Sequence, residues 1–372
     1  MNKIFEKGGK LYWLHSTVDA FETFLHVPGT VTRKGAHVRD AIDLKRILII
    51  VILAAVPAAV FGMWNIGYQH GLAMGQTGLH ILEYFWFGLL KTLPLFIVSY
   101  AVGLGIEFAA SQIRGEEVSE GYLVSGFFIP LIVPVDIPLW MLAVAVAFAV
   151  LVGKEFFGGT GMNIWNPALL TRAFLFFSYP SYMSGSDCWI AFKKGETPVA
   201  DAFTGATPLA LEGGSAQYGT GFWDLFIGTV PGSVGETSVI AILLGAIVLI
   251  WTGVASWKVM AGCVGGALLV GGLADLAGVS TMPCYMQLLC GGFAFGTVFM
   301  ATDPVTSAQT SCGKWIYGLL IGILCMTVRL FNPGYAEGMM LAILLGNTFA
   351  PLIDHCVTSI AVSRRNKKYK AA

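Results

Sequence analysis

Ten long apolar stretches constrain this chain more than any other feature of its sequence. Each is close to the ~20 residues with which an α-helix crosses the hydrocarbon core of a bilayer. Charged residues make up 12% of the chain, whereas soluble domains carry about 25%. The sequence therefore predicts an all-α polytopic membrane protein with about ten transmembrane helices. The stretches cover residues 47–67, 84–108, 121–136, 139–157, 167–183, 238–256, 259–277, 284–301, 315–331 and 337–356.

The short third and fourth stretches, the cysteine spacing and the net charge further limit the kinds of protein that this sequence can encode. The third and fourth stretches are short, and the two prolines in residues 133–139 predict a tight turn between them at the membrane edge. Seven cysteines show no C-x-x-C spacing, and five lie within these apolar stretches, so we expect buried thiols rather than a disulfide framework or a metal site. The formal net charge is zero, which gives no reason to expect a nucleic-acid partner.

The distribution of basic residues predicts the orientation of the chain. We place the arm formed by residues 1–46 in the cytoplasm, where positively charged loops are enriched. The outer loops then carry only Lys193 and Lys194. Both termini are therefore expected in the cytoplasm, and residues 184–237 are expected outside. The inner loops and the 357–372 tail carry Arg114, Lys154, Lys258, Lys314, Arg364, Arg365, Lys367, Lys368 and Lys370.

A weak internal repeat suggests how the helices are organised. Residues 158–168 form a glycine-rich run that closes on Asn-Pro, and residues 291–305 form another that closes on Asp-Pro. Such interruptions at matching places in two halves point to broken helices around a midplane site. We therefore expect an inverted five-plus-five repeat with halves at 47–183 and 238–356. The alternative is that the echo only reflects the high glycine content of membrane helices.

The long hydrophilic interval contains the segment Asp-Ala-Phe-Thr-Gly-Ala-Thr-Pro-Leu at residues 201–209. By composition alone it is a turn punctuated by glycine and proline. It also resembles the motif in which a secreted transferase attaches FMN to threonine through a phosphoester bond. That resemblance marks Thr207 as the acceptor within Thr204, Gly205, Ala206 and Thr207. The orientation predicted from the basic residues puts Thr207 outside, where such a transferase acts.

Two further groups of polar residues are candidates for binding. Asn163 and Asn166 flank Trp165 in the first glycine-rich run. Their amides suit the uracil-like edge of a flavin ring, and Trp165 is placed to stack on its face. The alternative is that the two amides satisfy backbone groups freed by the broken helix.

Three acidic residues lie in or beside apolar stretches, where ionisable groups are costly and are candidates for function. Glu107, Asp303 and Asp354 all lie toward the predicted cytoplasmic ends. A carboxylate next to free backbone carbonyls suits a hard cation such as Na+. The alternative is that these acids are structural, with Arg172, Lys91 and Arg329 as their ion-pair partners.

Taken together, these segments resemble the B subunits of Na+-pumping NADH:quinone oxidoreductases. The resemblance implies ten helices in a urea-transporter-like inverted repeat, covalent FMN on the outer side, a second, non-covalent flavin (riboflavin) and a quinone-reducing site. It also implies a bacterial inner membrane location, and partner subunits that include a periplasmic flavoprotein and iron–sulfur proteins. The similar segments lie at residues 37–40, 43–46, 62–65, 154–161, 166–168, 172–177, 204–207, 231–236, 300–305 and 337–344.

Two other interpretations remain open at the level of sequence. Pro208 after the acceptor threonine is a feature of the related D subunits of Rnf ferredoxin:NAD+ oxidoreductases, whereas the long N-terminal arm favours the quinone-reducing complex. A solute channel or transporter without a redox role is also compatible with the fold, because a fold does not determine a function. Flavin that stays with the denatured polypeptide would distinguish the redox proteins from a plain channel.

Overall fold

The structure is a computed structural model that describes residues 15, 18, 34–36, 44–76, 78–115, 118, 120–183, 188–192, 205–209, 221–280, 282–332 and 337–371. Within these residues every regular element is a helix. Thr204, Lys193, Lys194 and most of the N-terminal arm lie outside the described residues.

Six helical segments of the described chain are long and apolar enough to cross a membrane. Three further apolar helices are shorter. The long segments are α2 (Leu44–Ala73), α3 (Ile81–Arg114), α5 with the turn η2 (Leu139–Phe157), α9 (Trp257–Leu276), α12 (Ser311–Phe331) and the Met339–Lys367 part of α13 (Met339–Ala371). The shorter helices are α4 (Tyr122–Ile132), α6 (Pro167–Ser178) and α8 (Val239–Trp251).

All ten predicted stretches contain helix, but not all of them form one helix of membrane-crossing length. The stretch at 284–301 is divided into α10 (Cys284–Gln287), α11 (Phe293–Phe295) and a π-helical turn, η4 (Gly296–Met300). Glycines between α10 and α11 interrupt the helix, as the glycine-rich pattern predicts. The tight turn expected at 133–139 separates α4 from α5.

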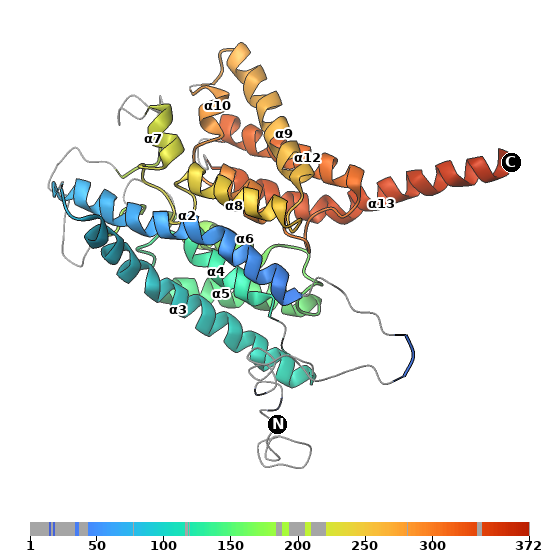
Figure 1. The fold of residues 1–372 in the computed structure, drawn as a ribbon, viewed down its shortest axis with the longest axis horizontal. Helices are drawn as coiled ribbons and strands as arrows, with labels where there is room; N and C mark the ends of the chain where they lie inside the picture. Colours follow the sequence, from blue (N-terminus) through green and yellow to red (C-terminus); the bar gives the residue numbers. More distant parts are fainter. Residues whose placement is uncertain are drawn as a thin grey trace.

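The helices form two groups that follow the order of the chain. In the first group α2 packs on α3, α3 packs on α4 and α5, and α5 packs on α6. In the second group α9 packs on α12, and α12 packs on α13. Helix α8 lies in the second half of the chain and contacts α11 and η4 there. Its contacts with α2, and those of α6 with α13, join the two groups (Figure 1). The start of α2 and the end of α13 lie toward the same side of the molecule in Figure 1.

Glycine allows α9 and α12 to approach closely. A Cβ added to Gly262 would lie 3.1 Å from the Cα of Gly318, and one added to Gly322 would collide with the backbone carbonyl of Cys263. Gly266, one turn further along α9, would meet Leu319 in the same way. Small residues four apart on facing helices are a common basis of helix association in membranes, where apolar burial alone drives little.

The interval expected to be an outer loop, 184–237, is only partly loop. It contains the short helix α7 (Phe222–Ile227), and its last part is buried between helices, with Ser233 and Val234 each only 1% exposed. The Gly235 N–H donates to the Leu131 carbonyl at 2.7 Å. A buried loop must satisfy its backbone polar groups internally, and this one does so against the end of α4.

Polar side chains on α2 attach this interval to the helices. Asn65 donates to the Val230 carbonyl at 2.9 Å, and Gln69 donates to the Thr229 carbonyl at 3.0 Å. His70 Nδ1 forms a 2.9 Å hydrogen bond with the Ala191 carbonyl. One face of α2 therefore holds two separate parts of the interval that carries the candidate flavin motif.

Candidate functional site

The first helix break lies between α5 and α6. Gly158, Gly159 and Gly161 all have positive φ (115°, 92° and 91°), a region that glycine enters without a steric penalty. The chain then enters α6 at Pro167, where proline costs no hydrogen bond. Asn166 caps this helix by accepting hydrogen bonds from the N–H groups of the second and third residues that follow it.

The second break follows η4. Asp303 folds this segment into a turn because its carboxylate accepts hydrogen bonds from the Val305 N–H at 3.1 Å and the Thr306 hydroxyl at 3.0 Å. π-Helical turns such as η4 are rare and occur often at functional sites. Helix then resumes at α12, eight residues beyond Asp303.

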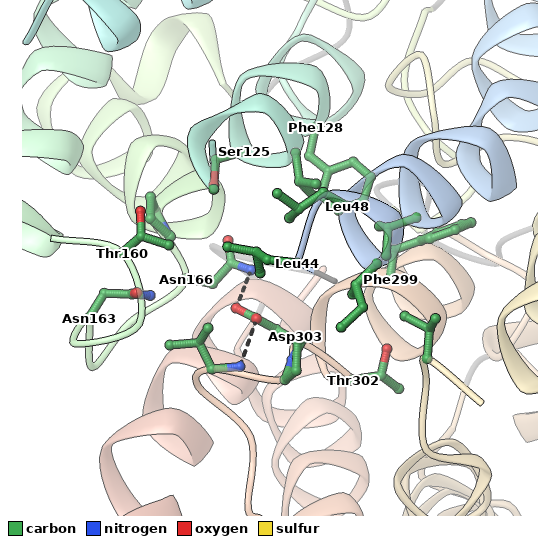
Figure 2. A pocket seen from close by; sticks show the side chains of 18 of the residues that line it. Leu44, Leu48, Ser125, Phe128, Thr160, Asn163, Asn166, Phe299, Thr302 and Asp303 are labelled. Atoms are coloured by element: carbon green, nitrogen blue, oxygen red, sulfur yellow. Dashed lines mark hydrogen bonds between the residues drawn. The ribbon is translucent and has the colours of Figure 1, made fainter. Parts of the chain in front are cut away.

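The two breaks meet. The Asn166 amide donates to the Asp303 carboxylate at 3.2 Å, across 137 residues of sequence. Beside this hydrogen bond lies a cavity of about 260 Å³, near the lower end of the ~300–1,000 Å³ typical of small-molecule sites. Its walls come from α2, α4, both breaks, η4 and the end of α8 (Figure 2).

The lining of this cavity combines aromatic rings with polar groups. Phe128 and Phe299 form part of the apolar wall, with ring centroids 5.8 Å apart. The Thr160 hydroxyl lines the cavity and is buried without a hydrogen-bond partner among the described residues. Asn163 and Asp303 contribute further polar groups (Figure 2). The combination offers a polar group for a ligand or water to meet, since a buried hydroxyl without a hydrogen-bond partner is costly.

Trp165 is not among the described residues that line the cavity, although Asn163 and Asn166 are. Its indole N–H donates to the Thr348 hydroxyl at 2.9 Å, and its ring meets Phe157 edge-to-face. The Asn163 amide donates to the Trp165 carbonyl at 3.1 Å. Both asparagines therefore satisfy local backbone groups and also contribute to the cavity wall.

Of the three candidate acids, only Asp303 lines the cavity. Glu107 forms a buried ion pair with Lys154, with side-chain exposures of 3% and 4%, and Lys154 in turn lines the cavity. The second oxygen of Glu107 has no hydrogen-bond partner among the described residues. Asp354 instead accepts hydrogen bonds from the Gln309 N–H at 2.6 Å and the Thr310 N–H at 2.9 Å, which ties α13 to the loop before α12.

The alternative in which these acids pair with Arg172, Lys91 and Arg329 is not what the described residues show. Arg172 pairs with Glu236 and Glu337, and Lys91 pairs with Asp136. Arg329 donates to the backbone carbonyls of Glu337, Gln287 and Cys290. The partners are separated by up to 165 residues in sequence, so sequence proximity gave no indication of them.

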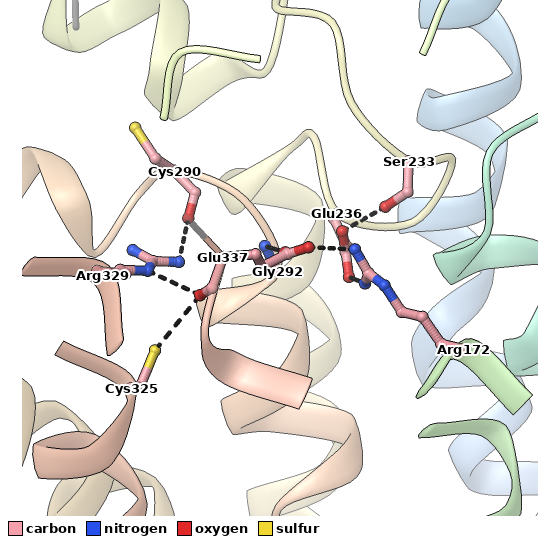
Figure 3. A network of polar contacts seen from close by, with 8 residues as sticks. All are labelled: Arg172, Ser233, Glu236, Cys290, Gly292, Cys325, Arg329 and Glu337. Atoms are coloured by element: carbon pink, nitrogen blue, oxygen red, sulfur yellow. Dashed lines mark hydrogen bonds and ion pairs between the residues drawn. The ribbon is translucent and has the colours of Figure 1, made fainter. Parts of the chain in front are cut away.

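These residues form a second polar site between the helix groups, which we call the charge cluster: Arg172, Glu236, Glu337 and Arg329 (Figure 3). Arg172 Nη1 lies 2.5 Å from Glu236 Oε1. The second oxygen of Glu236 accepts from the Ser233 hydroxyl at 2.5 Å, and Glu337 also accepts from the Gly292 N–H. Both carboxylates are thus hydrogen-bonded as well as ion-paired, as buried charges require.

The segment that carries Thr207 approaches this cluster through Leu209. Residues 205–207 have no helix or strand; Gly205 and Ala206 are buried, and Thr207 is half-buried. Two residues later, the side chain of Leu209 packs against Gly291: a Cβ added to Gly291 would lie 2.8 Å from Leu209, 3.2 Å from the Glu337 carboxylate and 3.5 Å from the Arg329 guanidinium. Leu209, at the end of the flavin-motif segment, therefore lies beside Glu337 and Arg329 of the charge cluster.

Comparisons with known proteins match nearly the whole chain. The model of the NQR2, RnfD, RnfE family matches residues 31–362. The B subunit of the Na(+)-translocating NADH-quinone reductase of Ectopseudomonas mendocina is 44% identical over 97% of this chain and 96% of that protein. The corresponding B subunits of Azotobacter vinelandii (42%, covering 97% and 96%) and Chromohalobacter salexigens (44%, covering 98% and 94%) are similar to the same degree. The chain belongs to the NQR2, RnfD, RnfE family.

Proposed function

We propose that this chain is the B subunit of a Na+-translocating NADH-quinone reductase in a bacterial inner membrane. In that role it passes electrons that originate from NADH through flavins toward quinone, coupled to Na+ export. The relatives that carry this name are similar over 94–96% of their own length, which supports the assignment of the whole chain. Six candidate membrane spans within the described residues agree with a role in the membrane part of such a complex.

The observation that carries the proposal most strongly is the meeting of the two helix breaks at one cavity. The Asn166–Asp303 hydrogen bond joins corresponding glycine-rich segments of the two halves. This supports the inverted five-plus-five arrangement of 47–183 and 238–356, similar to urea transporters, with a site at the junction. The cytoplasmic location of the 1–46 arm and the 357–372 tail belongs to the same proposal, with 184–237 on the outer face.

Two flavins are proposed for this chain. A flavin transferase attaches FMN to Thr207: the Thr207 hydroxyl attacks the flavin-side phosphorus of a flavin dinucleotide donor, the P–O–P bond breaks, and the nucleoside monophosphate leaves as the hydroxyl proton is released. The irregular backbone of residues 205–207 and the partial exposure of Thr207 support this assignment. Riboflavin is proposed in the cavity, where Asn163, Asn166 and the unpartnered Thr160 hydroxyl would meet its polar edge. When bound, flavins supply one- and two-electron chemistry that protein side chains lack.

The residues of the chain then have distinct tasks toward these groups. Phe128 and Phe299 exclude water from the cavity, and the amide of Asn166 orients a ligand while it caps α6. Asp303 is the preferred Na+ ligand because it lies in the break without a cationic partner among the described residues. Glu107 and Asp354 remain proposed Na+ ligands, although Lys154 already pairs with Glu107 and backbone N–H groups already engage Asp354.

The test uses the native complex purified from the membrane. We expect NADH:quinone activity that rises with Na+, and yellow fluorescence that stays with this polypeptide on a denaturing gel. Activity with ferredoxin and NAD+ instead of quinone would transfer the assignment to the Rnf type. A colourless polypeptide in a complex without redox activity would contradict the proposal and favour a plain channel or transporter.

A further inference from the structure

The charge cluster combines deep burial with an unequal distribution of counter-charges. The exposed fractions of the Arg172, Glu236 and Glu337 side chains are 5%, 7% and 15%. Electrostatic interactions are stronger in such surroundings than in water, because little solvent screens them. Two guanidinium groups and two carboxylates make the cluster neutral as a whole. A charge that is added to or removed from the cluster should therefore change the electrostatic potential at any group beside it.

Arg329 is the member of the cluster whose own hydrogen bonds go to uncharged groups. Its Nε donates to the Glu337 carbonyl and its Nη2 to the Cys290 carbonyl, both at 3.0 Å, and its Nη1 donates to the Gln287 carbonyl. Its guanidinium also lies over the Phe293 ring, 5.7 Å from the centroid. Carbonyl groups hold the guanidinium in position but do not cancel its charge. The two carboxylates of the cluster are directed at Arg172 instead.

The flavin-motif segment meets the cluster at this end. Gly291 has a φ of 59° and no side chain, so the Leu209 side chain, the Glu337 carboxylate and the Arg329 guanidinium all approach the same point. Thr207 is two residues from Leu209 and therefore lies within ~7 Å of it along the backbone. On the Leu209 side, Arg329 is the cation and Glu337 the anion that a group attached to Thr207 would meet.

We propose that the charge cluster, through Arg329 and Glu337, sets the reduction potential of the flavin carried by Thr207. The inference rests on the proposed function. The flavin gains one electron, which originates from NADH, and with it one negative charge; no proton or bond has to move. Arg329 stabilises that charge, whereas Glu337 opposes it. Both are positioning residues that act through their electrostatic field, and each also holds its neighbours in place.

The test measures the midpoint potential of the covalent flavin in the intact complex by redox titration. Arg329→Gln removes a positive charge and should lower the potential, while Glu337→Gln removes a negative charge and should raise it. We expect the ratio of reduced to oxidised flavin at a fixed potential to change at least tenfold in each case, about 59 mV for one electron. Arg329→Lys, which keeps the charge, should restore most of the wild-type potential.

Opposite shifts in potential separate this role from a structural one. Both substitutions disturb a buried network, so both should lower thermal stability, and a structural role alone would not give potential shifts of opposite sign. Shifts of the same sign, or none, overturn the inference. If Arg329→Gln does not assemble, Glu337→Gln and Glu236→Gln decide the matter, since each removes a negative charge from the cluster and leaves Arg329 in place; an unchanged or lower potential contradicts the inference.

In-gel flavin fluorescence of each variant shows whether the polypeptide carries covalent flavin, which the proposed function requires independently of the charge cluster. If the wild-type polypeptide carries no covalent flavin, the proposed function fails and the inference fails with it. If all variants carry covalent flavin with the wild-type potential, only the inference fails.

Discussion

The two polar sites between the helix groups differ in how completely their polar groups are satisfied. In the cavity, the Thr160 hydroxyl has no partner among the described residues, and Asn166 reaches Asp303 through a single hydrogen bond of 3.2 Å. In the charge cluster, the carboxylates of Glu236 and Glu337 each have an ion-pair partner and a further hydrogen-bond donor. The cavity leaves a buried hydroxyl open to a further partner, whereas the cluster satisfies its buried carboxylates internally.

Helix α6 connects the two sites. Asn166 caps its first turn at the cavity, and Arg172 projects from its second turn into the cluster. Six residues of α-helix span about 9 Å, so a short rigid element separates the open site from the closed one. Substitutions at the two sites should therefore differ in their main effect. Those in the cluster should mainly lower the stability of the protein, and those in the cavity should mainly lower ligand binding.

The largest expected effect is at the cluster. Arg172→Leu leaves Glu236 and Glu337 buried without their shared partner, which typically costs about 3–5 kcal/mol of stability. We expect the complex to lose assembly or to show a steep fall in unfolding temperature, measured in detergent. Lys45→Met is the matched control, because the Lys45 side chain is 41% exposed in its pair with Glu120 and such pairs are worth about 1 kcal/mol or less. Equal effects of the two changes would remove the contrast between the cluster and the surface.

The next effect tests the buried segment that carries Glu236. A Cβ on Gly62 would collide with the Val234 backbone carbonyl, so Gly62→Ala must displace this segment at a cost of about 1–3 kcal/mol. Gly265→Ala is the control, because a Cβ there meets nothing within 4 Å. We expect the first change to lower the unfolding temperature and the second to leave it the same or higher. If the two variants behave alike, the segment is not packed as described.

At the cavity, Asp303→Asn should change ion dependence more than stability. If Asp303 ligates Na+, loss of its charge should raise the Na+ concentration for half-maximal turnover roughly tenfold, about 1.4 kcal/mol. Early electron transfer from NADH should stay fast, because it occurs in other subunits. Asp136→Asn is the control, since Asp136 pairs with Lys91 away from the cavity. An unchanged Na+ requirement in assembled Asp303→Asn complex would contradict an ion site in this break.

The smallest expected change in stability separates the two tasks of Asn166. Asn166→Ala removes the helix cap and should cost about 1 kcal/mol. Asn166→Ser keeps a capping oxygen on a shorter side chain, so stability should be nearly unchanged. Both variants should lose extractable riboflavin while covalent flavin remains, measured by flavin analysis of the purified complex. Wild-type riboflavin content in the serine variant would leave Asn166 with a capping role only.

Much of the fold follows from local patterns in the sequence. Apolar stretches predict helices because a bilayer demands them, and α2 to α6 and α8 to α13 overlap these stretches. The break at 158–166 and the interruption at 288–292 contain glycines at 158, 159, 161, 291 and 292, which tolerate irregular backbone. The break that carries Asp303, at 301–310, contains no glycine and does not follow from such a run. The proximity of Asn166 and Asp303 agrees with the inverted arrangement expected from the weak repeat.

Other features depend on tertiary contacts that no local pattern contains. The partnership of Arg172 with Glu236 and Glu337 spans 64 and 165 residues, and the burial of Val234 is determined by Gly62 on a distant helix. In the sequence Lys154 indicates only a basic inner loop, so no local pattern predicts its ion pair with Glu107. Helix α7 was missed because six residues are too few to show a clear period.

The most direct test of the proposed function is the mass of the peptide that contains residues 201–212. In wild-type protein this peptide should carry one FMN, and fragmentation should assign it to Thr207. Thr207→Ala should abolish the adduct while the polypeptide still assembles in the membrane. An unmodified wild-type peptide, an adduct on Thr204, or an adduct that survives Thr207→Ala would contradict the assignment of Thr207 as the flavin carrier.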